Sequence, residues 1–221
     1  MLLDVDNTLF DNDQFAADLS AQLELRFGVR QRDRYWTLYA QRRARLGFAD
    51  YLGALEDFRA ECATERALLE MSAFLLDYPF AQRLYPHALE TIAYLHTVGQ
   101  PAVLSDGDVI FQPRKIQRSG IWEAVAGRVL ICVHKQFALE FMQCVFPATH
   151  YVMVDDKPQL LAAMKKVLGG RLSSVFVRQG HYALEAVEAH FDPPPDITIE
   201  CIGDLVNHRG MHELNTGYAP E

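Results

Sequence analysis

The chain has 221 residues, half of them hydrophobic, with a formal net charge of −8 and a pI near 5.5. This length and composition predict a globular protein with one full hydrophobic core and room for a smaller second domain. The acidic balance argues against a nucleic-acid surface, which needs clustered Lys and Arg, and the longest apolar run, residues 129–133, is far too short to span a membrane.

The first predicted element is a short apolar strand that leads into two carboxylates. Asp4 and Asp6 are separated by Val5, and residues two apart in an extended segment share a face. Such a pair can hold one divalent cation and one reacting group, and an ionised carboxylate needs no partner base to act as a nucleophile. Because Asn7-Thr8 follows, ordinary turn chemistry is the alternative interpretation, and the rest of the chain has to decide between them.

The next predicted elements are helices. Apolar residues at spacings of three and four extend from about residue 13 to Gly28, and similar patterns cover residues 35–46, 51–62 and 66–76. No run in this region alternates like a strand. We therefore expect residues 12–84 to form an all-α helical cap domain, inserted after the first strand.

Beyond residue 85, strands and helices alternate. The predicted helices and strands are, in turn, helices 87–98, 109–119, 135–145 and 158–168, and strands 101–104, 129–133, 151–154, 174–177 and 197–202. Such alternation is typical of a parallel sheet covered by helices on both faces. The predicted fold is therefore α/β, with a Rossmann-like parallel sheet sandwiched by helices that consists of residues 1–11 and 85–221.

Three further polar groups fall at or just beyond the ends of predicted strands, where open parallel sheets bind their ligands. Ser105 offers a hydroxyl, and Gly107 lets backbone amides approach an anion. Lys135 supplies a compact cation, and Asp155-Asp156 is a hard oxygen site suited to Mg²⁺. A turn, a solvated lysine and a helix cap are the structural alternatives, but the order of the motifs along the chain favours one shared site.

Other charged residues compete for functional roles. Lys115 lies in the middle of a predicted helix and Lys157 adjoins the acidic pair, so placement at a strand end favours Lys135 as the cation of the site. Between residues 24 and 48, seven Arg stand against one Asp and one Glu. The run at 42–45 is a hypothetical attachment point for a phosphorylated or carboxylated molecule, and a solvated helix face is the favoured alternative.

In this order the motifs resemble the haloacid dehalogenase-like hydrolase superfamily, specifically its phosphatase-type members with a helical cap inserted after the first motif. The resemblance covers nearly the whole chain and rests on four segments: Asp4-Val5-Asp6-Asn7-Thr8-Leu9, Leu104-Ser105-Asp106-Gly107, Lys135 and Val154-Asp155-Asp156. It implies an enzyme that hydrolyses a small-molecule phosphomonoester through an aspartyl-phosphate intermediate and that uses Mg²⁺ as its cofactor.

The resemblance also implies roles for single residues. Asp4 is the nucleophile, Asp6 protonates the leaving oxygen and later activates water, and Lys135 neutralises charge. The group expected to bind the phosphoryl group consists of Ser105, Asp106 and Gly107. The expected Mg²⁺ site consists of Asp4, Asp6 through its backbone carbonyl, Asp155 and, close by, Asp156. Two departures are Gln159, where many relatives carry another acid, and Asp106, where Asn is commoner.

Three other functions stay open at this point. A phosphomutase or phosphotransferase shares the phosphoaspartate and differs only in the acceptor. A 2-haloacid dehalogenase needs the nucleophilic Asp4 but neither Asp6 nor a metal. A non-enzymatic phosphoacceptor module resembling a receiver domain would carry its acidic pair before the acceptor Asp.

The expected partner is a small phosphorylated metabolite, with no nucleic-acid or membrane partner. The four cysteines are widely scattered without a Cys-x-x-Cys pair, and no secretory signal precedes Asp4. These features predict a cytoplasmic protein with free thiols.

Overall fold

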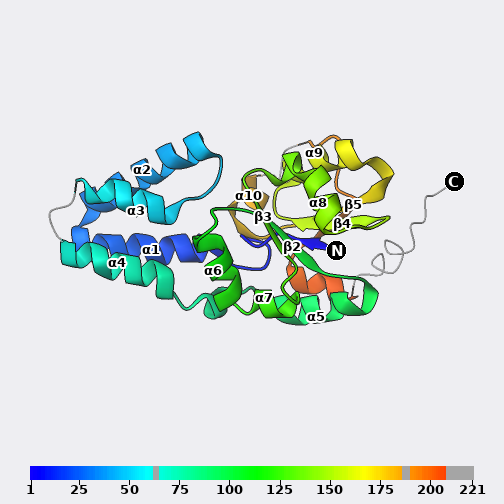
Figure 1. Ribbon diagram of the computed structural model, residues 1–221, viewed down its shortest axis with the longest axis horizontal. Helices are drawn as coiled ribbons and strands as arrows, with labels where there is room; N and C mark the ends of the chain where they lie inside the picture. Colours follow the sequence, from blue (N-terminus) through cyan, green and yellow to red (C-terminus); the bar gives the residue numbers. More distant parts are fainter. Residues whose placement is uncertain (62–64, 186–189, 208–221) are drawn as a thin grey trace.

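A computed structural model of the chain describes residues 1–61, 65–185 and 190–207. Within these residues, the strands form one parallel sheet in the order β3-β2-β1-β4-β5-β6 (Figure 1). The strands are β1 (Leu2–Leu3), β2 (Ala102–Asp106), β3 (Val129–Cys132), β4 (Tyr151–Asp155), β5 (Leu172–Val177) and β6 (Ile197–Ile199). The predicted α/β fold with a Rossmann-like parallel sheet is thus confirmed.

Helices cover both faces of this sheet. The α-helices are α1 (Asn12–Phe27), α2 (Val29–Leu46), α3 (Tyr51–Arg59), α4 (Glu65–Asp77), α5 (Ala88–Val98), α6 (Phe111–Arg118), α7 (Ile121–Ala124), α8 (Leu139–Val145), α9 (Pro158–Leu168) and α10 (Gly180–Glu185). Short 3₁₀ helices are η1 (Phe80–Arg83), η2 (Lys135–Phe137), η3 (Gly169–Arg171) and η4 (Ile202–Asn207). Helices α8 and α9 pack on one face, and α5, α6, α7 and η4 pack on the other.

The central strands show why both faces are covered. Side chains alternate between the faces, so Val103 and Val154 contact the α5 side while Leu104 and Met153 contact the α8 side. All four are buried, as expected of parallel strands between two helical layers. Strand β1 occupies the centre, because its Leu3 pairs with Val103 on one side and Val154 on the other.

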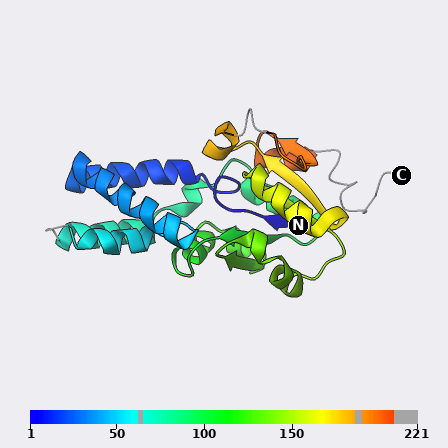
Figure 2. The same cartoon turned by 90° about the horizontal axis from the view of Figure 1, so that it is seen from above.

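Helices α1 to α4, here called the helical segment, lie beside the sheet domain, at the left in Figure 1, and Figure 2 shows the same separation from above. Their interior is rich in buried aromatic rings, among them Phe15, Tyr35, Tyr51 and Phe58. Helix α1 starts at Asp11, whose side chain accepts a hydrogen bond from the Gln14 N–H, as an N-cap residue does. Between β1 and α5, the regular elements that the structure describes are the helices α1 to α4 and the 3₁₀ helix η1.

Two short connectors join the helical segment to the sheet, and they pair with each other. The Asp11 N–H donates to the Arg83 carbonyl at 2.7 Å, and the Tyr85 N–H donates to the Leu9 carbonyl at 2.9 Å. The chain therefore enters and leaves the helical segment at one place.

The helix expected over residues 135–145 is interrupted. It opens with the 3₁₀ turn η2, and α8 begins only at Leu139. Asp106 Oδ1 accepts a hydrogen bond from the Lys135 N–H at 2.7 Å, which fixes this turn on the end of β2.

The last predicted strand, residues 197–202, is also shorter than expected. It ends at Ile199, and η4 begins at Ile202. The Asp204 side chain accepts hydrogen bonds from the N–H groups of Glu200 and Cys201, which turns the chain away from the sheet. No helix in the described part of the chain is long and apolar enough to cross a membrane. The cysteines that the structure describes, Cys132, Cys144 and Cys201, are free.

Candidate active site

The order of the strands brings the predicted site residues together. From β1 the chain continues to β2 on one side, and from β4 it continues to β5 on the other side. The loops after β1 and β4 therefore diverge, which makes their carboxyl ends the topological switch point of the sheet. Asp4 directly follows β1 and Asp155 ends β4, so both carboxylates lie at this point.

Lys135 lies buried between these two carboxylates. Its Nζ is 2.5 Å from Asp4 Oδ1 and 2.6 Å from Asp155 Oδ2. Burial alone would lower the pKa of Lys135, but the negative charges of Asp155 and Asp4 outweigh it and raise the pKa. The side chain is therefore held as an ammonium ion between the two acids.

Asp156 completes a buried acidic cluster with Asp4 and Asp155. One carboxylate oxygen from each residue lies within 4.8 Å of the others. Both side-chain oxygens of Asp156 are buried and have no hydrogen-bond partner among the described residues. Burial and the charge of Asp155 raise the pKa of Asp156 to about 9. Since buried oxygens need partners and Mg²⁺ prefers carboxylate oxygen, these three residues fit a divalent cation.

The Asp6 side chain points toward α6 and away from this cluster. Lys115 Nζ donates to Asp6 Oδ1, and Gln112 Nε2 donates to Asp6 Oδ2 at 3.2 Å. Lys115 is fully buried, whereas 22% of the Asp6 side chain is exposed. The contact to Mg²⁺ that the resemblance implies for Asp6 uses the backbone carbonyl, so the position of this side chain does not conflict with it.

Ser105 lies within β2, which extends beyond the strand predicted over residues 101–104. It is buried, and its Oγ accepts a hydrogen bond from Gln112 Nε2 at 2.9 Å. Because the same amide group also binds Asp6, Gln112 links the predicted phosphoryl-binding serine to the predicted acid.

Asp106 and Gly107 hold other residues of the site in place. Asp106 carries the hydrogen bond to the Lys135 N–H, so it holds the turn from which Lys135 reaches Asp4. The Gly107 N–H donates to the Cys132 carbonyl at 3.0 Å, and this amide is therefore already paired. A Cβ atom on Gly107 would lie only 2.8 Å from Cβ and Cγ of Gln112, so the glycine lets Gln112 approach.

Sequence reasoning gave no role to Thr8 or Gln112, and it weighed Lys115 only as a competitor of Lys135. Thr8 Oγ1 donates to Asp4 Oδ2 at 3.4 Å, and Gln112 and Lys115 bind Asp6. A signal existed in α6, because Gln112 and Lys115 share one helix face with the buried Phe111. Polar side chains on a buried face need partners, which marks them as candidates.

Lys157, the other lysine weighed against Lys135, lies at the edge of the acidic cluster. Its N–H donates to Asp155 Oδ1 at 2.9 Å, and its Nζ is 5.0 Å from the centre of the Tyr182 ring. Burial would lower its pKa, but Asp4 and the neighbouring acids outweigh this and raise it.

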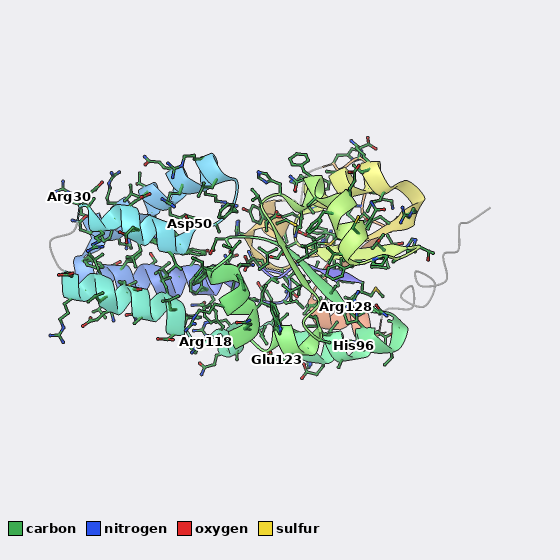
Figure 3. The ribbon with its side chains drawn as sticks, in the orientation of Figure 1. Arg30, Asp50, His96, Arg118, Glu123 and Arg128 are labelled. Carbon is green, nitrogen blue, oxygen red and sulfur yellow. The ribbon has the colours of Figure 1, made fainter. Side chains whose placement is uncertain are left out.

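The arginines of α2 do not act as one group. Arg42 is paired with Asp50 and Asp57 at 2.6 and 2.8 Å, and Arg30 lies at the end of the helical segment far from the sheet (Figure 3). Arg43 donates to the Tyr182 hydroxyl in α10. Within the hypothetical attachment point at 42–45, Arg42 is thus paired inside the helical segment, whereas Arg43 contacts the sheet domain.

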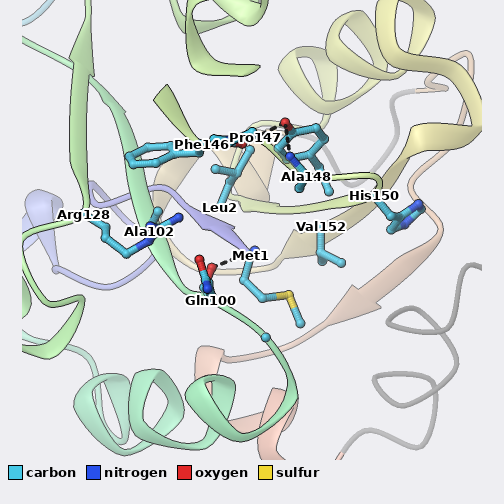
Figure 4. Close-up of a pocket in the computed structure, with 12 residues that line it drawn as sticks. Met1, Leu2, Gln100, Ala102, Arg128, Phe146, Pro147, Ala148, His150 and Val152 are labelled. Carbon is cyan, nitrogen blue, oxygen red and sulfur yellow. Dashed lines mark hydrogen bonds between the residues drawn. The ribbon is translucent and has the colours of Figure 1, made fainter. Parts of the chain in front are cut away.

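A cavity of about 260 Å³ lies elsewhere, near the amino ends of β1, β2 and β4 (Figure 4). Its lining includes Gln100, Arg128, His150 and Tyr151. This is the sheet edge opposite Asp4 and Asp155, so the cavity and the acidic cluster are separate features.

A family model described as haloacid dehalogenase-like hydrolase matches residues 1–167. Among solved structures, a haloacid dehalogenase-like hydrolase from Burkholderia xenovorans LB400 is 52% identical, with a TM-score of 0.88, and the match covers 96% of this chain and 97% of that chain. No curated protein matches the chain significantly.

More distant structures share the fold. The L-2-haloacid dehalogenase of Xanthobacter autotrophicus has 17% identity and a TM-score of 0.59, and the HAD-hydrolase YfnB of Bacillus subtilis, solved with magnesium bound, has 13% and 0.63. Both matches cover 93% of this chain and 96% of the other.

Proposed function

Because this chain belongs to the haloacid dehalogenase-like hydrolase family, we propose that it is a Mg²⁺-dependent phosphatase that hydrolyses a small phosphomonoester through an aspartyl phosphate on Asp4. The observation that carries the proposal is the buried cluster of Asp4, Asp155 and Asp156, in which the Asp156 oxygens lack partners among the described residues. These charges would repel a phosphate dianion unless a cation offset them. A site of this kind therefore supports phosphoryl transfer with a metal ion.

In the proposed reaction, the Asp4 carboxylate attacks phosphorus, the bond to the ester oxygen breaks, and Asp6 gives its proton to that oxygen. A water molecule then gives a proton to Asp6 and attacks phosphorus, and the bond from phosphorus to Asp4 breaks. The products are an alcohol and inorganic phosphate, and both acids return to their starting forms.

The surrounding residues favour this transfer electrostatically. The ammonium of Lys135 lies beside Asp4, where it would offset charge on the phosphoryl oxygens, and Ser105 adds a hydroxyl. Mg²⁺, held by Asp4, Asp155 and Asp156, would supply Lewis-acid stabilisation of that charge. Asp106 and Gly107 would contribute by positioning Lys135 and Gln112.

We also propose that residues 12–84 form a cap domain over a core domain of residues 1–11 and 85–221. The support is the packing of α1 to α4 on one another and the paired connectors at Asp11 and Arg83. Arg43, which reaches Tyr182 in α10, supports a position of the cap close to the site.

A 2-haloacid dehalogenase is the strongest alternative, since such enzymes share this fold. Dehalogenation by this family uses the nucleophilic Asp but needs neither Asp6 nor a metal. The Asp156 oxygens, which have no hydrogen-bond partner in the described part of the chain, and the two hydrogen bonds that hold Asp6 both favour the phosphatase.

The test is phosphate release from a panel of small phosphomonoesters, measured with Mg²⁺ and with EDTA for the wild type and Asp4→Asn. We expect release that requires Mg²⁺ and is lost in Asp4→Asn, because a carboxamide does not replace the nucleophile. Asp77→Asn, an exposed acid, is the matched control and should behave like the wild type.

Other outcomes identify the competing functions. Halide release from 2-haloacids without phosphate release would establish the dehalogenase and overturn the phosphatase. Oxygen from labelled water should appear in the released phosphate, whereas its absence together with a phosphorylated acceptor would indicate a phosphomutase. Phosphate release that survives Asp4→Asn would refute the assignment of Asp4.

A further inference from the structure

Lys115 in α6 is a fully buried cation that the proposed reaction leaves without a role. Its Nζ donates to Asp6 Oδ1 and lies 3.4 Å from Asn12 Oδ1. The other neighbours of the ammonium are aromatic, with ring centres 5.2 Å away for Phe10 and 5.8 Å away for Phe111. Burial of an ammonium ion is unfavourable unless an opposite charge compensates it, and here the compensating charge is Asp6.

Gln112 takes the second oxygen of the same carboxylate. Its Nε2 donates to Asp6 Oδ2 at 3.2 Å, and Gln112 itself is buried. Gln112 and Lys115 are three residues apart in α6, so both donors project from one side of one helix. Asp6 is thus fixed through both side-chain oxygens while part of its surface stays exposed to incoming molecules.

We propose that Lys115, assisted by Gln112, is a positioning residue that fixes the Asp6 carboxyl group for proton transfer to the leaving oxygen. The proposal rests on the proposed phosphatase function, in which Asp6 is the proton donor. The proton passes from Asp6 to the oxygen that departs from phosphorus, and the resulting carboxylate stays paired with the Lys115 ammonium.

This role has a specific kinetic signature. A proton donor acts only within hydrogen-bond reach of the oxygen that it protonates, so loss of its orientation slows proton transfer. An alkyl phosphate needs that proton, because an alkoxide is a poor leaving group. The phenolate of p-nitrophenyl phosphate leaves without one. Loss of Lys115 should therefore slow formation of the aspartyl phosphate far more from the first substrate than from the second.

The first experiment compares these two substrates in Mg²⁺. For Lys115→Met we expect the single-turnover rate of leaving-group release, which precedes the shared hydrolysis of the aspartyl phosphate, to fall by about 100-fold or more with the alkyl phosphate, the usual size of general acid catalysis. With p-nitrophenyl phosphate the same rate should fall by less than about tenfold. Lys115→Arg keeps the cation and should restore part of the alkyl phosphate rate. Equal losses with both substrates, or no loss with the alkyl phosphate, would overturn the proposal.

The matched control is Arg118→Met, which removes a cation from the same helix one turn later. Arg118 is exposed and pairs with Asp77 at the surface (Figure 3), so both substrates should react as in the wild type. A selective loss in this variant would mean that any change in α6 affects proton transfer, which contradicts a special role for Lys115.

A second comparison remains decisive if Lys115→Met does not fold. Asp6→Asn is compared with Asp6→Asn/Lys115→Met, in which both charges of the buried pair are removed. Without a proton donor, loss of Lys115 should lower the alkyl phosphate rate no further, whereas a further loss of more than about tenfold would refute the positioning role.

The activity of the wild type distinguishes failure of the phosphatase function from failure of the positioning role of Lys115. If it releases no phosphate from any ester in Mg²⁺, the proposed function fails and the role of Lys115 falls with it. If it is active but Lys115→Met shows no preference between the substrates, only the positioning role is refuted.

Discussion

The backbone N–H of Lys135 donates to Asp106 Oδ1 at 2.7 Å, so a carboxylate at the end of β2 positions the lysine that follows β3. Burial raises the pKa of this carboxyl group, and the hydrogen bond from Lys135 acts in the opposite direction. Asp106 had been expected to bind the phosphoryl group. In the structure its Oδ1 accepts a hydrogen bond from the turn that carries Lys135. We therefore expect Asp106 to matter as a hydrogen-bond acceptor.

Two substitutions of Asp106 should show whether its acceptor oxygen or its negative charge supports the site. Asp106→Ala removes the acceptor and should lower the free energy of unfolding by about 1.5–3 kcal/mol, the usual range for a hydrogen bond to a charged group. It should also lower kcat, because the turn that carries Lys135 is released. Asp106→Asn keeps an acceptor oxygen and should retain most of both. Urea unfolding and phosphate release measure the difference, and equal losses in the two variants would contradict the anchoring role.

Lys135→Met should destabilise the protein as well as inactivate it. The substitution leaves the buried carboxylates of Asp4 and Asp155 without their cation, and breaking a buried ion pair typically costs about 3–5 kcal/mol. Chemical unfolding without metal measures this loss. Lys166→Met is the control, since Lys166 is 62% exposed and its contact to Asp192 is 3.8 Å long. A stable Lys135→Met protein would show that the pair contributes little.

Gly107→Ala should damage the site through packing alone. The added methyl group would overlap Gln112, which binds both Ser105 and Asp6, so Gln112 must move. We expect a loss of about 1–3 kcal/mol in unfolding free energy, as for other overpacked positions, and a lower kcat. Gly170→Ala is the matched control, because a Cβ there meets no atom within 4 Å. Full activity of Gly107→Ala would show that Gln112 has room to adjust.

The metal-free protein should become less stable as the pH rises. Burial and Asp155 raise the pKa of Asp156 from 3.8 to about 9, so the folded chain binds a proton that the unfolded chain releases. Its contribution to stability is present at low pH and is lost between these two values as pH rises. Unfolding in EDTA across this range measures the slope. Asp156→Asn cannot ionise and should flatten it, and an unchanged slope in this variant would refute the assignment to Asp156.

Addition of Mg²⁺ should stabilise the wild type more than the Asp156→Asn variant. The wild type should gain about 2.7 kcal/mol at a Mg²⁺ concentration 100-fold above the dissociation constant. Asp156→Asn, which has lost one anionic ligand, should gain less at the same concentration. Thermal unfolding with a Mg²⁺ titration is the measurement. Equal stabilisation of both proteins would place the cation away from Asp156.

The main features of the sheet and the convergence of its polar ends were predictable from the sequence. Apolar β-branched runs alternate with helical patterns, and parallel strands present their carboxyl ends at one edge. Asp4, Lys135 and Asp155 meet there because the strands that carry them are β1, β3 and β4 of one sheet. The ends of the strands and their order along the chain were therefore enough to predict that these side chains meet.

The remaining contacts depend on how helices dock, which a local pattern does not encode. Lys115 competed with Lys135 in the sequence only as a lysine within a helix, and the docking of α6 beside the loop after β1 gives it Asp6 as a partner. The anchoring of the turn before α8 is likewise tertiary, because the acceptor of the Lys135 N–H is Asp106 from a distant part of the sequence.

The paired connectors at Leu9 to Asp11 and Arg83 to Tyr85 have an engineering consequence. Since the two ends of the excursion already run side by side, a tight turn of a few residues would close the gap without moving β1 or α5. The pairing of the connectors predicts that residues 12–82 can be exchanged as one unit. A sheet domain trimmed in this way, or grafted with the equivalent stretch from the Burkholderia relative, would show whether substrate choice travels with the transplanted piece.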